Sequence, residues 1–379
     1  MADENNAYSF TTAATRQVTI ADPAAQGFRM WRGGRLSELT LAYETWGELS
    51  AAADNAIIIF TGLSPSAHAA SSSQDPTPGW WEYMVGPGKA IDTNRFFVVC
   101  ANSLGGCYGT TGPSSINPET GRRYGADFPD VTVEDIASSG YYLMRELGVH
   151  KLHAAVGSSM GGMSSIAYAM QYPGEIDYLI SISAATSALP LTIALRSLQR
   201  EIIRSDPAWN NGQYDDDNKP LMGMSLARKL GLVSYRAADE WNSKFDRSRI
   251  APDKLTGKRF EREFEIENYL EYNAQKFIHS FDPNSYLYLS RCMDWFDVAE
   301  HGGSLEAGMA KLALRRALVV GVTTDILFPS RQQKEIADLM RTTGTEVDYV
   351  EIDSANGHDA FLIDDAHFSP VVKAFLDAS

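Results

Sequence analysis

The stretch "HAAVGSSMGGMSSIAYAM" (residues 153–170) places a serine in a short turn between two regular elements. The apolar run before Gly157 predicts a β-strand, and the small and apolar residues after Gly161 predict a helix. A glycine stands two positions before and two positions after Ser159, which is the GxSxG frame of a nucleophile elbow, whereas Ser158 lacks the second glycine. The stretch therefore predicts that Ser159 is a nucleophile displayed on a strand–turn–helix unit.

Outward from this unit, short apolar runs alternate with helical patterns. Because these runs are continuously hydrophobic, they predict strands covered on both faces, as in a parallel sheet. Residues 133–148 and 331–344 have helical spacing, and each ends in a glycine suited to a helix C-terminus. The alternation predicts a doubly wound, mostly parallel α/β sheet. The runs interpreted as strands are residues 55–60, 95–100, 151–157, 176–183, 316–322 and 346–352.

The alternation stops in the third quarter of the chain. Residues 187–305 contain tryptophans, paired charges and helical spacing, but no convincing strand. We interpret this segment as a helical lid inserted into a catalytic core formed by residues 1–186 and 306–379.

An aspartate and a histidine stand where partners of the serine are needed. In this type of fold the acid and the histidine follow the nucleophile in chain order, at the ends of later strands. Asp325 follows the predicted strand 316–322, and His358 follows the predicted strand 346–352. We expect Ser159 to attack an acyl carbonyl, His358 to take and return its proton, and Asp325 to orient the imidazole and stabilise its cation.

An oxyanion hole needs two backbone N–H groups near the nucleophile. One belongs to the residue after the serine, Met160, and the other to a loop after an early strand. That loop is "FTGLSPSAHAA" (residues 60–70), and Leu63 is the expected donor. The loop also contains His68, the one serious rival to His358, but His68 precedes the nucleophile in the chain.

Composition excludes several other classes of protein. The chain has 379 residues, of which 44% are hydrophobic, so it can bury a large core. Its net charge of −15 argues against a nucleic-acid or anionic membrane surface, and no apolar stretch approaches the length of a membrane span. Three cysteines without a CxxC pair indicate neither a disulfide framework nor a cysteine zinc site, and residues 1–17 lack a signal-peptide pattern. We expect a cytoplasmic protein.

Several longer motifs resemble one known family. The stretches "NSLGGCYGTTGPSSINPETGRRYGADFP" (102–129), "GSSMGGM" (157–163), "FDPNSYLYL" (281–289), "TTDILFP" (323–329) and "GHDAFLID" (357–364) resemble the homoserine O-acetyltransferase family of α/β-hydrolase proteins. The resemblance spans about residues 25–378.

This resemblance implies acyl transfer from an acyl-CoA co-substrate, through an acyl-serine, to the side-chain hydroxyl of a small amino acid. It also implies a helical lid, a homodimer, and neither a metal nor a bound cofactor. By matching position, Ser159, Asp325 and His358 are the family's triad. Arg228 and Asp359 match the residues that hold the carboxylate and the ammonium of the acceptor.

Within the family, the chain is most similar to the serine O-succinyltransferase branch of cysteine and methionine biosynthesis. The similarity lies in residues 189–217 and in the oxyanion loop, where Gly62, Leu63, Ser64 and Pro65 stand at the position expected to set substrate specificity. Succinyl-CoA carries a terminal carboxylate that needs a cation in a closed site. Arg196 and Arg200, four residues apart on one predicted helix face, are the candidates.

Donor and acceptor are left open by the residues themselves. Serine and homoserine differ by one methylene, which a pocket discriminates by only ~1–3 kcal/mol. L-Homoserine O-acetylation or O-succinylation is therefore an alternative to L-serine O-succinylation. The motifs also allow a serine esterase or a non-catalytic α/β-hydrolase scaffold, and the complete Ser–His–Asp set argues against the scaffold.

Overall fold

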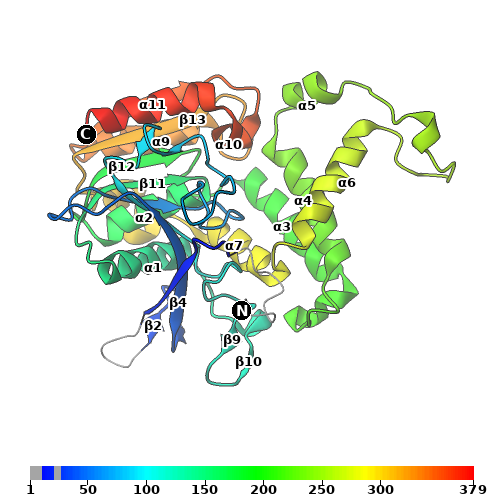
Figure 1. Ribbon diagram of the computed structural model, residues 1–379, viewed down its shortest axis with the longest axis horizontal. Coiled ribbons are helices and arrows are strands. Elements are labelled where there is room, and N and C mark those ends of the chain that lie inside the picture. The colour runs from blue at the N-terminus through cyan, green and yellow to red at the C-terminus, as the bar shows by residue number, and fades with distance from the viewer. Residues whose placement is uncertain (1–10, 21–26) are drawn as a thin grey trace.

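The main element of the computed structural model, which describes residues 11–20 and 27–379, is an eight-stranded sheet (Figure 1). Its strand order is β1-β4-β8-β5-β11-β12-β13-β14. The six strands from β8 to β14 run parallel, and β4 and β1 extend the sheet as antiparallel strands. In sheet order the strands are β1 (Arg16–Ile20), β4 (Leu39–Trp46), β8 (Phe97–Ala101), β5 (Ala56–Phe60), β11 (Leu152–Ser158), β12 (Ile176–Ile182), β13 (Arg316–Val322) and β14 (Glu346–Ile352).

The predicted doubly wound, mostly parallel sheet is confirmed. All six apolar runs form strands of the parallel part, and the predicted helices correspond to α1 (Val133–Glu146) and α9 (Ser330–Thr342). The two antiparallel strands β1 and β4 were not predicted. Three two-stranded sheets also form outside the main sheet, namely β2 (Phe28–Arg29) with β3 (Arg35–Leu36), β6 (Val85–Gly86) with β7 (Ile91–Asp92), and β9 (Ile116–Asn117) with β10 (Arg122–Arg123).

Hydrophobic cores lie on both faces of the sheet, which explains the continuous apolar runs. Along β5, Ile58 and Phe60 belong to the core shared with α1, α2 (Met160–Gln171) and α9. Ile57 and Ile59, which point to the other face, belong to the core shared with α11 (Asp365–Asp377). Successive residues of a strand point to opposite faces, so the side chains on both faces of β5 must be apolar.

The segment between β12 and β13, all of which the structure describes, contributes helices and no strand to the main sheet. Helices α3, α4, α5 and α6 lie beside the sheet, at the right of Figure 1, and α3 and α6 both pack on α4. The helices of this segment are α3 (Pro190–Ser205), α4 (Leu221–Tyr235), α5 (Ala238–Phe245), α6 (Glu265–Ile278), α7 (Pro283–Trp295) and α8 (Leu305–Met309).

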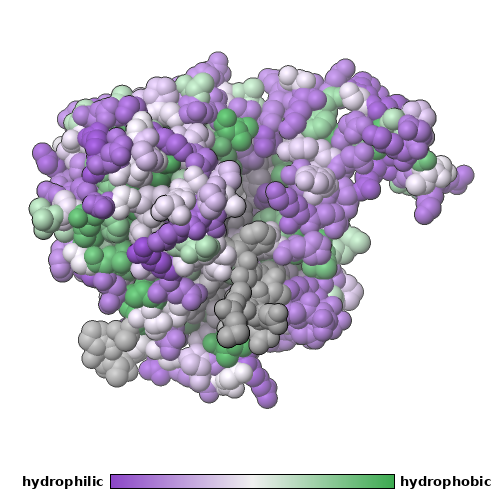
Figure 2. Space-filling model, viewed as in Figure 1, coloured by the Kyte–Doolittle hydropathy of each residue, from purple (hydrophilic) through white to green (hydrophobic). Residues whose placement is uncertain are grey.

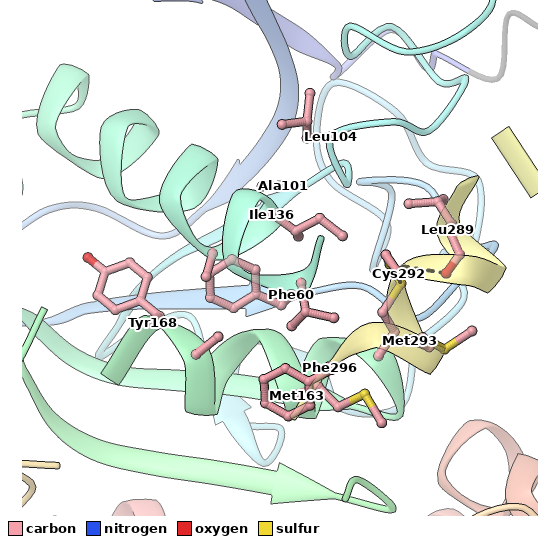
Figure 3. Packing of buried hydrophobic residues seen from close by; sticks show 14 of the residues in the cluster. Phe60, Ala101, Leu104, Ile136, Met163, Tyr168, Leu289, Cys292, Met293 and Phe296 are labelled. Atoms are coloured by element: carbon pink, nitrogen blue, oxygen red, sulfur yellow. Dashed lines mark hydrogen bonds between the residues drawn. The ribbon is translucent and has the colours of Figure 1, made fainter. Parts of the chain in front are cut away.

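Helix α7 returns from this segment to the core. Its residues Cys292 and Met293, together with Phe296 just after it, are buried in the same core as Met163 of α2 (Figure 3). Cys292 Sγ lies 3.8 Å from Met160 Sδ, at the start of α2. Helix α7 is therefore held against the helix that follows Ser159.

The surface has the polarity expected of an acidic globular protein. On the face drawn in Figure 2, hydrophilic residues predominate and apolar residues form small separate patches. Among the described residues, no helix is both long enough and apolar enough to cross a membrane. Residues 1–17 were expected to lack a signal peptide, and the first ten of them lie outside the described residues.

Candidate active site

Ser159 stands at the apex of a sharp turn between β11 and α2. Its backbone has φ 56° and ψ −123°, a conformation that a residue with a side chain adopts only under strain. A methyl group on Gly157 would lie 2.0 Å from the carbonyl oxygen of Gly161, and one on Gly161 would lie 2.0 Å from the carbonyl oxygen of Phe60. Both glycines are therefore required by close packing of backbone against backbone, which is the geometry of a nucleophile elbow.

The structure brings His358 and Asp325 to this serine. His358 Nε2 lies 2.8 Å from Ser159 Oγ, and His358 Nδ1 lies 2.6 Å from Asp325 Oδ2. The other carboxylate oxygen, Asp325 Oδ1, accepts hydrogen bonds of 2.9 Å from the backbone N–H groups of Leu327 and Phe328. All three side chains are buried, and the loops after β13 and β14 place Asp325 and His358 in one hydrogen-bonded chain with Ser159.

The surroundings of His358 favour its charged form. Burial alone would lower the pKa of His358, but the charge and hydrogen bond of Asp325, and the charge of Asp359, raise it above its usual value. Arg196 opposes this effect to a smaller extent. The site therefore has the electrostatics to stabilise an imidazolium at His358, as a histidine that acts as a general base requires.

The two expected oxyanion donors lie on either side of Ser159 in the chain. Met160 is the first residue of α2, so its N–H belongs to the helix N-terminus, where amide groups lack intrahelical partners and the helix dipole favours an anion. Leu63 lies in the loop after β5, the strand next to β11. Leu63 lines the cavity that contains Ser159.

This cavity, of about 120 Å³, lies where the loop after β5 meets the inserted helices. The whole predicted specificity loop, residues 62–65, lines it, together with Ser159 and His358. The inserted segment contributes Arg196 from α3 and Arg228 from α4. The cavity is thus lined on one side by loops at the strand ends of the sheet and on the other side by helices α3 and α4.

The two residues expected to hold the acceptor also line the cavity. The Arg228 guanidinium lies over the Phe277 ring at 4.3 Å, and its buried Nε has no hydrogen-bond partner among the described residues. Asp359 faces the cavity next to His358, and its Oδ2 accepts a 3.0 Å hydrogen bond from Arg236 Nε. Arg236, which follows α4, was not predicted from the sequence.

The two arginines expected to select the donor, Arg196 and Arg200, line different cavities. Arg196 lines the cavity with Ser159, whereas Arg200 lines a separate cavity, so the structure does not bring Arg200 to the site. Both pair with Asp294 of α7, Arg196 through Nε at 2.6 Å and Arg200 through Nη2 at 2.7 Å. Sequence reasoning missed Asp294 because nothing in the spacing of α3 and α7 shows that the helices pack together.

His68, the rival to His358, has hydrogen-bond partners at both ring nitrogens. His68 Nδ1 lies 2.9 Å from the buried Glu44 carboxylate of β4, and His68 Nε2 lies 2.9 Å from the Thr77 carbonyl oxygen. Both ring nitrogens are therefore used in fixing the loop that contains Leu63. Ser158, the rival serine, has a buried hydroxyl with no hydrogen-bond partner among the described residues.

Comparisons with known proteins agree with this geometry. A family model described as the alpha/beta hydrolase fold matches residues 55–365. The chain is 55% identical over 364 residues to a serine O-succinyltransferase of Litchfieldella anticariensis, covering 96% of this chain and 98% of that protein.

Two crystal structures have the same fold over nearly the whole chain. A homoserine O-acetyltransferase from Bacillus anthracis matches with a TM-score of 0.86 and 29% identity, over 96% of this chain and 98% of that chain. An esterase matches with a TM-score of 0.84 and 30% identity, over 96% of this chain and 100% of that chain. The chain therefore belongs to the α/β-hydrolase family and, within it, to the family of the serine O-succinyltransferases.

Proposed function

We propose that the protein is an acyl-CoA-dependent O-acyltransferase that transfers a succinyl group to the hydroxyl of L-serine. The observation that carries this proposal is the cavity that combines Ser159, bonded to His358, with the buried cation Arg196. Such a cavity can form an acyl-serine and can also pair a carboxylate at the far end of the acyl group. The name of the 55% identical relative supports the same reaction.

The proposed reaction has two half-reactions. In the first, His358 takes the Ser159 proton, Ser159 Oγ bonds to the thioester carbonyl carbon, and the carbon–sulfur bond breaks as the CoA thiolate takes the proton from His358. In the second, the acceptor hydroxyl gives its proton to His358 and attacks the acyl-serine, and the Ser159 oxygen leaves and takes that proton back. The N–H groups of Met160 and Leu63 stabilise the oxyanion in both.

The acceptor is held by its two charges. Arg228 pairs with the α-carboxylate, a role supported by its place in the cavity lining and by its buried Nε, which has no hydrogen-bond partner among the described residues. Asp359 pairs with the α-ammonium through the oxygen that Arg236 does not use. The loop at residues 62–65 limits the length of the acceptor side chain, which favours serine over homoserine.

The inserted segment 187–305 acts as the lid of this enzyme, and the lid is the dimerisation surface. Exposed apolar side chains line one face of α3, at Leu191 and Leu198, and one face of α4, at Met222, Leu226 and Val233. Light scattering tests this assignment: Met222→Lys with Leu226→Lys yields monomers, and a dimer that persists would exclude the surface. The enzyme acts in the cytoplasm, in cysteine or methionine biosynthesis.

Hydrolysis is the second candidate, because an esterase shares the fold at 30% identity. The two reactions differ only in whether water or an amino acid accepts the acyl group from Ser159. Thiol release from succinyl-CoA and from acetyl-CoA, with L-serine, L-homoserine or no acceptor, separates them. Release that needs L-serine and prefers succinyl-CoA supports the proposal. Release without an acceptor would indicate a hydrolase, and preference for acetyl-CoA would exclude the succinyl assignment.

A further inference from the structure

A buried charge cluster lies behind the cavity wall, where α3 packs against α7. Asp294 Oδ1 accepts a 2.6 Å hydrogen bond from Arg196 Nε, and Asp294 Oδ2 lies 2.7 Å from Arg200 Nη2. Arg200 Nη1 also donates a 2.9 Å hydrogen bond to the buried hydroxyl of Ser290. Asp294 is therefore shared between two guanidinium groups.

This cluster contains one more positive charge than negative charge. Its two guanidinium groups face one carboxylate, and the Arg196 and Asp294 side chains are each only 8% exposed. An excess charge is costly at a buried site unless a counter-ion pairs with it. Of the two arginines only Arg196 lines the cavity with Ser159, so the missing anion is to be expected there.

Arg200 determines how Asp294 binds Arg196. A carboxylate beside an arginine ordinarily forms two parallel hydrogen bonds, here to Nε and Nη2. In this structure Asp294 Oδ2 is paired with Arg200, and Arg196 Nη2 is buried without a hydrogen-bond partner among the described residues. One oxygen of Asp294 thus orients the Arg196 guanidinium, and Nη2, on the same edge as Nε, stays buried beside Asp294, so Arg196 is held by one hydrogen bond of this pair and not by two.

Asp294 also lies on a helix, α7, that is packed into the protein core. Its neighbours Cys292, Met293 and Phe296 are buried in the core against α2, as Figure 3 shows for their side chains near Met163. Asp294 therefore keeps its place relative to Ser159 by the packing of α7.

We propose that Asp294 is a positioning residue for donor selection: it fixes Arg196 so that the guanidinium can receive the terminal carboxylate of a dicarboxylic acyl group on Ser159. Asp294 does not line the cavity and does not touch the acyl group. The proposal rests on the proposed function, since it explains how the succinyl group is distinguished from acetyl.

The test compares kcat/KM for succinyl-CoA and acetyl-CoA at saturating L-serine in wild type and variants. Asp294→Asn lowers the value for succinyl-CoA about tenfold or more beyond its effect on acetyl-CoA, because only succinyl needs the oriented guanidinium. Asp294→Glu restores part of the preference. Asp130→Asn is the matched control, since Asp130 pairs with Arg291 on the same helix, away from the cavity, and it keeps the wild-type donor ratio.

A second variant keeps the test valid if Asp294→Asn does not fold. Arg200→Gln frees Asp294 Oδ2 to bind Arg196 Nη2 as well, which draws the Arg196 guanidinium toward α7, so it also lowers the preference for succinyl-CoA, although Arg200 is outside the cavity. Equal losses with both donors in Asp294→Asn, or a wild-type donor ratio in Arg200→Gln, would overturn the role of Asp294. A wild-type enzyme that prefers acetyl-CoA would instead refute the proposed function itself, before any variant is made.

Discussion

Arg236 Nε donates a 3.0 Å hydrogen bond to Asp359 Oδ2, so the chain directly after α4 is tied to the residue that follows His358. The same two parts of the chain also meet at Tyr235, the last residue of α4, whose ring centroid lies 6.4 Å from that of His358. Asp359 also acts on His358 at a distance, because its charge contributes to the raised pKa of the imidazole.

The first prediction concerns this charge. His358 must be neutral to accept a proton, so activity is lost on the acid side as pH falls through its pKa, which lies above the usual value of about 6.5. Asp359→Asn removes a negative charge, which disfavours the imidazolium, and the acid limb of kcat/KM therefore moves to lower pH. Acceptor-free cleavage of a simple ester is the assay, because acceptor binding cannot then contribute. Asp353→Asn, an exposed site after β14, is the control, and an unmoved limb in Asp359→Asn would contradict the electrostatic argument.

The nucleophile can be identified by trapping the acyl-enzyme. Ser159→Ala forms no adduct after a pulse of succinyl-CoA, because the hydroxyl bonded to His358 is gone. Ser158→Ala still forms the adduct, because the Ser158 hydroxyl contacts neither His358 nor Asp325. Intact-protein mass spectrometry measures both, and an adduct on the Ser159→Ala protein would exclude the assignment.

The acid of the relay is tested by an isosteric change. Asp325→Asn keeps the shape of the side chain but favours the wrong imidazole tautomer, so kcat falls by roughly 10⁴. Circular dichroism establishes that the variant is folded. Asp353→Asn retains activity, since Asp353 bonds to Thr323 at 3.0 Å instead of to His358. Near wild-type turnover in a folded Asp325→Asn protein would show that another carboxylate has this role.

We expect donor preference to depend on Arg196. Arg196→Met leaves the succinyl carboxylate buried without a cation, which costs ~2–5 kcal/mol in kcat/KM for succinyl-CoA and much less for acetyl-CoA. Arg204→Met, at an exposed site on the same helix, changes neither donor appreciably. Steady-state kinetics measure kcat/KM for both donors in each variant. Equal losses in Arg196→Met would remove this arginine from acyl recognition.

The buried pair of His68 and Glu44 makes folding stability depend on pH. Burial opposes the charged form of His68, but its hydrogen bonds to Glu44 and to the Thr77 carbonyl raise its pKa above the ordinary value. A raised folded pKa gives stability that is fully present below the unfolded pKa of about 6.5 and is lost as pH rises through the folded pKa.

His68→Gln removes this dependence, so the free energy of unfolding differs from wild type most at pH 6 and less above neutral pH. Urea denaturation at several pH values measures the difference. His367→Gln, at an exposed histidine paired with Asp364, serves as the control. A difference that stays constant with pH would mean that folding leaves the pKa of His68 unchanged, and a difference that grows above neutral pH would mean that folding lowers it.

The parallel part of the sheet was predictable because both faces of each strand are covered. Strand β4, "LTLAYETW", was missed because Thr40, Glu44 and Thr45 interrupt its apolar pattern. Glu44 is nevertheless buried, since His68 and the hydroxyl groups of Thr12 and Thr15 satisfy its carboxylate. These partners are distant in the sequence, so no local pattern predicts a buried acid at this position.

The candidate site was likewise predictable only in part. Chain order and strand ends were enough to select the residues that the structure brings together as Ser159, His358 and Asp325. The four-residue spacing of Arg196 and Arg200 predicted that they share one helix face, but not that both pair with Asp294. Which arginine reaches the cavity depends on how α3 sits on α7, and this is a property of tertiary packing.

The positive φ angle of Ser159 means that the fold and the chemistry have opposing requirements at one position. Holding a residue with a side chain in this region costs on the order of 1–3 kcal/mol, and glycine would adopt the same turn with little strain. The sequence thus forgoes stability at this turn in order to present a hydroxyl group. Selection for thermal stability alone would drive this position toward glycine, and the serine persists only where turnover is selected as well.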